Sequence, residues 1–280
     1  MRGAATMLLM VLAVGGCANG PTRSVLPGAT PQPPASRSPI PAPPGLVAAG
    51  SLTVGADYHF APQSYVDPSG HAAGFDIDLV GAIASQMKLT LKVINIDDPS
   101  IIQGLSEQKR RYDMGVNQPH AAAVTAGAVA LSYFSSGQAL MARASDKQVK
   151  GFDTICGLRV WASPQSEGEL AVISVNDKAC HDRKATVTSA KDDVDAAQQL
   201  ADGKIDALVD DYPAAVLLAK TIKGTRVVPK HIASAVDLVF PPGGEPFRDA
   251  VARALDRLVK DGSYKRLLEK WGLGEGALLK

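Results

Sequence analysis

The stretch that decides the fold is GFDIDLVGAIASQMKLTLKVI, residues 74–94. Its first half has apolar residues at helical spacing, namely Phe75, Leu79, Val80, Ile83 and Met87. Asp76 and Asp78 fall in the first turn of that helix, where the helix dipole favours carboxylates. Residues 89–94 then alternate as in a strand, and a short β-type run at 52–55 precedes the helix. Together these segments predict a β-α-β unit.

The same patterns continue along the chain. We expect strands over 158–162 and 205–209, and helices over 194–200, 247–259 and 264–271. Strands that alternate with helices predict an α/β architecture, in which ligands collect at the carboxyl ends of the strands. The sequence contains no GxGxxG, Walker A, HExxH or GxSxG motif, so none of these common nucleotide or hydrolase signatures is present.

The composition excludes two broad classes of protein. Of the 280 residues 46% are apolar, 20% charged and 5% aromatic, which is too apolar for a disordered chain. A formal charge of +1 does not suggest a nucleic-acid partner. The charge is unevenly distributed, because residues 1–50 contain three basic and no acidic residues. Residues 51–280 are therefore mildly acidic and long enough for two lobes of ordinary domain size.

The N-terminal segment predicts export and anchoring. Arg2 precedes the apolar run Met7–Val14, which is far shorter than the ~20 residues that a membrane-spanning helix needs. Residues 14–17, Val-Gly-Gly-Cys, resemble the lipobox of bacterial lipoproteins. This resemblance implies a signal peptide at 1–16 and a lipid on Cys17, which would hold the protein on the extracytoplasmic face of the cell membrane. The alternative is an ordinary cleaved signal that is followed by a chance cysteine.

Residues 17–50 form the predicted tether. Nine of the 19 prolines lie between Pro21 and Pro44, and the segment has no apolar periodicity. Such a composition predicts a partly extended spacer. Beyond it, Cys156 and Cys180 form an even pair, which in an exported chain predicts one disulfide. His181 alone does not complete a zinc motif, so we expect no metal site and no cofactor.

Short motifs occur in a fixed order from residue 52 to residue 272. In the first half they are LTVGAD at 52–57 with Phe60-Ala61-Pro62 and Tyr65, Gly70 with GFDIDL at 74–79, IQGL at 102–105 with YDM at 112–114, and YFSSGQ at 133–138. In the second half they are GKIDA at 203–207 with Asp211 and Pro213, and DGSY at 261–264 with KWG at 270–272. In this order they resemble the extracytoplasmic solute-binding proteins of family 3, which are commonly the amino-acid receptors of ABC importers. The positions of Cys156 and Cys180 also look like a disulfide of actinobacterial members.

The resemblance implies a two-lobed, periplasmic-binding-protein-like (type II) α/β fold with two hinge strands, at 138–142 and 237–240. Lobe 1 would comprise residues 51–141 and 237–280, and lobe 2 residues 142–236. The implied function is capture of a small polar solute, amine-containing or amino-acid-like, and its delivery to the permease and ATPase subunits of an ABC importer. Such a receptor would be a monomer and would not be an enzyme.

The resemblance also points to ligand-binding residues. They are Asp57 and Phe60 in lobe 1 and Ser166 and Asp211 in lobe 2, although Ser166 could equally be a simple helix cap. Where the family carries its carboxylate clamp, Asn117, Gln118 and His120 could supply neutral hydrogen bonds to the ligand or could belong to a solvated loop with no role, and Gln165 lies in the lobe 2 loop that normally binds the ligand. Phe60 matches an aromatic residue that stacks on the ligand, although it could equally be a core residue. Ser166 matches a helix N-cap and donor, and Asp211 matches the partner of the ligand's ammonium group.

Three departures from the family pattern concern the ligand. The family usually has an arginine that clamps the ligand carboxylate, but no arginine occurs from Tyr112 through Ala142. A phenylalanine that normally follows the proline is Gln63 here, and Gln165 replaces a glycine. Because the sequence has the partner of the ligand's ammonium group, Asp211, but lacks the arginine that binds its carboxylate, it favours an amine, a cationic solute or a modified amino acid as the ligand.

Two other classes of function remain open. One is a sensor or scaffold for a membrane signalling protein. The other is a dehydratase-type enzyme on the same fold, which the missing arginine disfavours because that chemistry needs a cationic clamp for substrate carboxylates.

Overall fold

The computed structural model describes residues 38–229 and 232–278. Residues 39–280 make one compact unit, which is described below. The predicted signal peptide, Cys17 and the first part of the tether lie outside the described residues. No helix in the described part of the chain is both long enough and apolar enough to cross a membrane.

One mixed sheet runs through the unit in the order β5-β1-β6-β12-β7-β10-β8-β9, with β11 beside β7. The central β-α-β prediction is confirmed, because β1 pairs in parallel with β5 and α1 connects them. The strands of this sheet are β1 (Ser51–Ala56), β5 (Thr90–Asn95), β6 (Met114–Pro119), β7 (Val129–Arg143), β8 (Arg159–Ala162), β9 (Thr186–Thr188), β10 (Ala207–Asp211), β11 (Thr225–Val227) and β12 (Ile232–Phe240).

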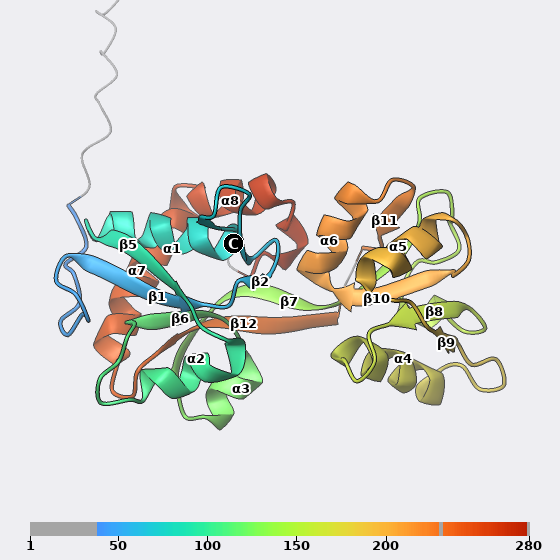
Figure 1. The fold of residues 1–280 in the computed structure, drawn as a ribbon, viewed down its shortest axis with the longest axis horizontal. Helices are drawn as coiled ribbons and strands as arrows, with labels where there is room; N and C mark the ends of the chain where they lie inside the picture. The colour runs from blue at the N-terminus through green and yellow to red at the C-terminus, as the bar shows by residue number, and fades with distance from the viewer. Residues whose placement is uncertain (1–37, 230–231, 279–280) are drawn as a thin grey trace, which may run out of the picture. The chain divides into compact units, whose positions relative to one another are not determined.

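Eight α-helices cover the described sheet. They are α1 (Phe75–Gln86), α2 (Asp98–Leu105), α3 (His120–Thr125), α4 (Glu167–Lys178), α5 (Asp193–Ala201), α6 (Tyr212–Thr221), α7 (Glu245–Lys260) and α8 (Ser263–Trp271). Lobe 1 contains β1, β5, β6, α1 to α3, α7 and α8, together with a small sheet of β2 (His59–Phe60), β3 (Ser64–Val66) and β4 (Ala72–Ala73) (Figure 1). Lobe 2 contains β8 to β11 and α4 to α6 (Figure 1). In lobe 1, α1 and α8 lie on one face of the sheet and α2 and α3 on the other (Figure 1).

The two lobes are joined by β7 and β12, which run from one to the other (Figure 1). These strands are antiparallel, with Phe240 opposite Val129 and Ile232 opposite Gln138. The predicted hinge ranges are parts of these two strands, but they do not pair with each other. Residues 138–142 pair with β10, and residues 237–240 pair with the start of β7. Where β7 and β12 cross between the lobes, residues 134–138 of β7 pair with residues 232–236 of β12.

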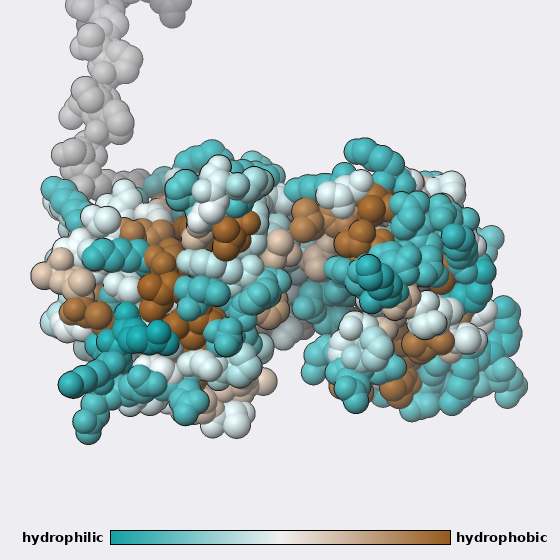
Figure 2. Space-filling model, viewed as in Figure 1, coloured by the Kyte–Doolittle hydropathy of each residue, from teal (hydrophilic) through white to brown (hydrophobic). Residues whose placement is uncertain are grey.

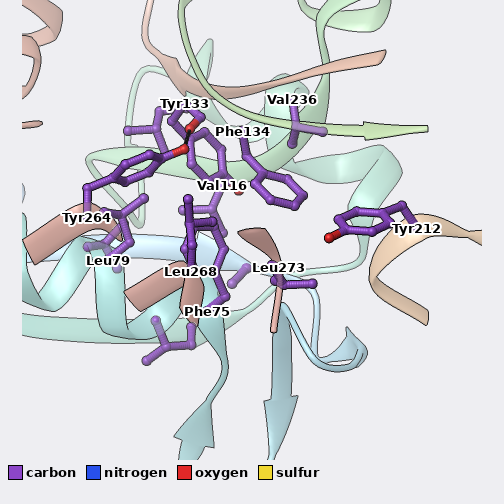
Figure 3. Packing of buried hydrophobic residues seen from close by; sticks show 14 of the residues in the cluster. Phe75, Leu79, Val116, Tyr133, Phe134, Tyr212, Val236, Tyr264, Leu268 and Leu273 are labelled. Carbon is purple, nitrogen blue, oxygen red and sulfur yellow. Dashed lines mark hydrogen bonds between the residues drawn. The ribbon is translucent and has the colours of Figure 1, made fainter. Parts of the chain in front are cut away.

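The core of lobe 1 is built on aromatic rings (Figure 3). The Phe75 ring lies 5.2 Å from that of Phe134 and 6.2 Å from that of Tyr133, measured between centroids. Tyr264 of α8 closes this cluster, and its hydroxyl donates to the Tyr133 carbonyl oxygen at 2.6 Å. These rings are fully buried, and burial of such large side chains contributes most of the apolar stabilisation.

The compact unit begins before residue 51, the predicted start of lobe 1. Ile40 is only 2% exposed, and its N–H donates to the Gln86 carbonyl oxygen at the end of α1. The Asp113 carboxylate accepts from the N–H of Val47 at 2.6 Å and from that of Thr53 at 2.8 Å. The last part of the predicted spacer, from Pro39, is therefore fixed on lobe 1.

The predicted disulfide between Cys156 and Cys180 is present. It joins the segment before β8 to the segment after α4, so it closes a loop that contains both elements. On the face shown in Figure 2, apolar residues form separate patches with hydrophilic side chains between them. Such scattered exposure is usual for a protein surface.

Candidate functional site

Lobe 1 brings several predicted residues to the ends of β1 and β6. Asp57 follows β1, Asn117 and Gln118 lie near the end of β6, and His120 begins α3. Because β1 and β6 pair in parallel, with Val54 opposite Met114, their carboxyl ends meet at one edge of the sheet. The fold therefore places these residues at the edge where α/β proteins bind ligands.

Asp57 organises this edge. Its Oδ1 accepts from the backbone N–H of His59 at 3.0 Å and lies 2.7 Å from His59 Nδ1, while its Oδ2 accepts from the N–H of Asp98 at the start of α2. Burial raises the pKa of Asp57, but the hydrogen bonds from Asp98 and His59 outweigh it and leave the pKa below its usual value. Both oxygens of this carboxylate are thus engaged within the protein.

Gln118 is buried at this edge of the sheet and does not reach its surface. The side chain is buried, and its Nε2 donates to Asp98 Oδ1 at 2.7 Å and to the Val116 carbonyl oxygen. Burial raises the pKa of Asp98, the charge of Asp57 adds to that rise, and the Gln118 hydrogen bond opposes it. Gln118 therefore holds Asp98 in place.

Asn117 faces the opposite side of β6. Its Oδ1 accepts from Nε2 of Gln63 at 2.8 Å, and its φ of 57° is in the left-handed region, which Asn tolerates better than most residues. The Asn117 backbone also hydrogen-bonds the hydroxyl of Tyr133, which in turn donates to Asp76 Oδ1 at 2.6 Å. Gln63 and Asn117 are 54 residues apart in the chain, so only the fold brings their amides together.

His120 is held by a buried acid. Its Nδ1 lies 2.8 Å from Oδ2 of Asp237, which has no exposed side-chain surface, and Ser132 Oγ donates to the other Asp237 oxygen at 2.6 Å. The His120 side chain itself is about half exposed. Asp237 therefore fixes one imidazole nitrogen, and Nε2 has no hydrogen-bond partner among the described residues.

Phe60 is exposed rather than part of a core. It lies in β2 (His59–Phe60), which forms a small sheet with β3 (Ser64–Val66) and β4 (Ala72–Ala73). Its exposed fraction is 37%, which excludes the core alternative. Exposed aromatic surface beside polar strand ends is suited to stacking on a ligand.

In lobe 2 the start of α4 is capped by its own side chains. Ser166 is the N-cap as predicted, since its Oγ accepts from the N–H of Glu169 at 3.2 Å and donates to the Ser163 carbonyl oxygen. The N–H of Gln165, whose φ is 60°, donates to Oε2 of Glu169 at 2.7 Å. Glu167 also lies in this first turn. Two carboxylates at this helix start oppose the binding of a further anion.

Asp211 lies at the end of β10 opposite Gln138 of β7. The Gln138 Nε2 donates to Asp211 Oδ1 at 2.6 Å, and the residue remains exposed. Partial burial of the carboxyl raises the pKa of Asp211, and the negative charge of Glu167 adds to that rise, while the Gln138 bond opposes it. A neighbouring cation would relieve this repulsion.

Asp210 adds a third carboxyl to this corner. Burial raises its pKa to about 7, and the charges of Asp211 and Asp193 contribute, although the N–H of Asp211 donates to its Oδ1. Its Oδ2 is buried and has no hydrogen-bond partner. The end of β10 and the start of α4 thus carry these three carboxyls, on Glu167, Asp210 and Asp211, and a fourth on Glu169, which accepts from the N–H of Gln165. Within the described residues no group of His, Cys, Asp and Glu side chains is arranged to hold a metal ion.

The fold and site together define a two-lobed solute-binding protein. Residues 52–274 match the family model described as bacterial extracellular solute-binding proteins, family 3, and the chain belongs to this family. The chain is 27% identical to the arginine-binding protein ArgT of Corynebacterium glutamicum over 247 residues, which cover 84% of this chain and 79% of that protein.

Solved structures support the fold. An ancestral cationic amino acid solute-binding protein superposes with a TM-score of 0.69 at 24% identity, covering 79% of this chain and 95% of the other. The L-cystine solute receptor of Neisseria gonorrhoeae in its unliganded open conformation gives a TM-score of 0.68 at 21% identity, covering 82% and 95%. At these identities the likeness establishes the two-lobed α/β fold.

The structure adds residues that the sequence reasoning did not place in the site. Gln138 and Asp237 hold Asp211 and His120, and Gln63 joins Asn117. The strand pairing that sets Gln138 opposite Asp211 depends on register, which the sequence pattern does not specify. Only Gln63 had a signal, as a departure from the family pattern.

Proposed function

We propose that this protein is a lipid-anchored receptor on the extracytoplasmic face of a cell membrane, which delivers a small amine-containing or amino-acid-like solute to an ABC importer. The family supports solute binding. Anchoring through Cys17 is supported by the lipobox-like sequence at 14–17 and by the Pro-rich segment that follows it. In this proposal the Pro-rich segment after Cys17 links the lipid to lobe 1, on which the chain is held from Ile40 onward.

The observation that carries the proposed ligand class is the acidic corner of lobe 2. Asp211 is exposed and is held by Gln138, and the negative charge of Glu167 lies close enough to raise the pKa of Asp211. An ammonium group at this place would gain charge-assisted hydrogen bonds, which are stronger than neutral ones. The arginine-binding relative supports a cationic solute.

Lobe 1 supports the same conclusion, because its site residues are neutral or already engaged. Asn117 and Gln63 carry neutral amides, and both oxygens of Asp57 accept hydrogen bonds from the protein. Arg143, the first arginine after the arginine-free stretch 112–142, donates to the Ile205 carbonyl oxygen and lies 3.6 Å from Asp206. We therefore infer that the ligand's carboxylate, if it has one, contributes little to affinity.

A thermal-shift screen tests this proposal. The purified protein is heated with amino acids, amines, polyamines and quaternary ammonium compounds, and a specific ligand should raise the melting temperature by mass action. Asp211→Asn should weaken binding of the best amine by about ten- to hundredfold, the value of one hydrogen bond to a charged group. The matched control is Asp177→Asn, which alters an exposed carboxylate of the same lobe. If Asp211→Asn leaves the stabilisation intact, the assignment of Asp211 is wrong.

A further inference from the structure

Gln63 and Asn117 form a polar pair beside the exposed Phe60. The Gln63 N–H donates to the Phe60 carbonyl oxygen at 2.7 Å, so both residues belong to one turn. The Gln63 side chain reaches Asn117 of β6 through the 2.8 Å amide hydrogen bond. Gln63 is 6% exposed and Asn117 is half-buried, which places the pair at the surface of lobe 1 with most of its bulk inside.

The hydrogen bond between the two amides leaves one C=O group and one NH₂ group without a partner in the described part of the chain. Among the described residues, Oε1 of Gln63 and Nδ2 of Asn117 have no hydrogen-bond partner, and neither is among the fully buried unpartnered atoms. Exchanging the oxygen and nitrogen of both amides reverses the hydrogen bond but leaves the same result, one free C=O and one free NH₂. The surface of lobe 1 therefore offers a paired acceptor and donor.

Both backbones are held rigidly. The Gln63 carbonyl oxygen accepts from the N–H of Asp76, and a Cβ on Gly74, whose φ is 130°, would lie 2.0 Å from that oxygen. Asn117 keeps its φ of 57° while its backbone binds the buried Tyr133 hydroxyl. A left-handed conformation at a non-glycine residue costs free energy, so the contacts of Asn117 with the rest of lobe 1 must hold it there. The donor and acceptor are thus preorganised.

A paired C=O and NH₂ selects a particular ligand chemistry. A carboxylate has acceptors only and would face the free C=O unfavourably, and an ammonium has donors only. A carboxamide presents one of each and satisfies both groups at once. We propose that Gln63 and Asn117 form a specificity-determining subsite that binds a neutral carboxamide-type group of the solute. This inference rests on the proposed receptor function and names the second group that the ligand carries.

Calorimetric titration of the purified protein with argininamide, agmatine and arginine tests the subsite. These probes share the guanidinium and amine groups and differ in having a carboxamide, no substituent or a carboxylate at the same carbon. Argininamide should bind about tenfold more tightly than either of the others, because two further neutral hydrogen bonds form. Asn117→Gly keeps the positive φ but removes the amide, and it should abolish this advantage without weakening agmatine.

Gln63→Leu is the second variant, and it should also abolish the preference for argininamide over agmatine. Its matched control is Gln103→Leu, at an exposed position on α2. The control should keep the preference for argininamide. Equal affinity of the wild-type protein for argininamide and agmatine overturns the subsite but leaves the Asp211 assignment standing. Tighter binding of arginine than of argininamide also overturns it. Failure of all three probes to bind overturns the proposed cationic ligand class, and with it the subsite.

Discussion

The buried carboxyl of Asp76 should make the stability of this protein fall as pH rises from about 5 to 7.5. Asp76 has no exposed surface, and it accepts from Tyr133 at 2.6 Å, with Ser64 Oγ 3.4 Å away. Burial raises its pKa from 3.8 to about 7, against the effect of these two hydrogen bonds. Between these two values the folded protein holds a proton that the unfolded chain has lost, so folding is favoured at the acidic end.

The size of the effect follows from the two pKa values. One pKa unit corresponds to about 1.4 kcal/mol, so a folded-state pKa near 7 adds about 3 kcal/mol to the free energy of unfolding at pH 5 and almost nothing at pH 7.5. Asp76→Asn removes this contribution. The stability difference between wild type and variant should therefore change by about 2 to 3 kcal/mol over this range.

Urea unfolding at half-unit steps from pH 5 to pH 7.5 measures this difference. Asp210, whose pKa is also raised to about 7, contributes the same slope in wild type and variant and therefore cancels in the comparison. Asp177→Asn, at an exposed site, should show the wild-type pH dependence. A change below about 0.5 kcal/mol for Asp76→Asn would show that Asp76 is ionised in the folded protein across this range, and the reasoning would fail.

Three further variants test the fold. Replacing both Cys156 and Cys180 by serine removes a bridge between residues 24 apart and should lower the free energy of unfolding, measured in urea, by about 3.5 kcal/mol. No loss would show that the bridge does not form. Ile40→Ala should cost about 2 to 4 kcal/mol because the side chain is buried, and a loss below about 0.5 kcal/mol would place this segment outside the fold. Trp271→Phe removes the 2.8 Å hydrogen bond from the indole Nε1 to Asp78 and should lower the melting temperature by a few degrees, and an unchanged value would refute that bond.

The helices and strands could be predicted because their side-chain periods are strong. The stripe from Phe75 to Met87 became α1, and the predicted strand at 205–209 became β10. The helix over 247–259 became α7, which begins two residues earlier and ends one residue later than predicted. Local patterns of this kind depend only on which face of an element is buried.

The contacts that build the site could not be predicted in the same way. Gln63 and Asn117 meet only after β2, β3 and β6 are in place, and Gln138 meets Asp211 only in the observed register. The Pro-rich segment from Pro39 was expected to be free spacer because it has no periodicity. Ile40 and Pro43 are buried and Leu46 packs against the core of lobe 1, but so few apolar residues in a Pro-rich segment do not show a helical or strand period.

The central claim is that this receptor recognises an ammonium group through Asp211. The most direct test is calorimetric titration of the wild-type protein and Asp211→Asn with the tightest-binding amine of the screen and with its N-acetyl derivative. We expect N-acetylation to weaken binding to the wild type by at least about tenfold and to change binding to Asp211→Asn little, a coupling of about 1.4 kcal/mol or more. Equal loss on N-acetylation in both proteins would contradict the account.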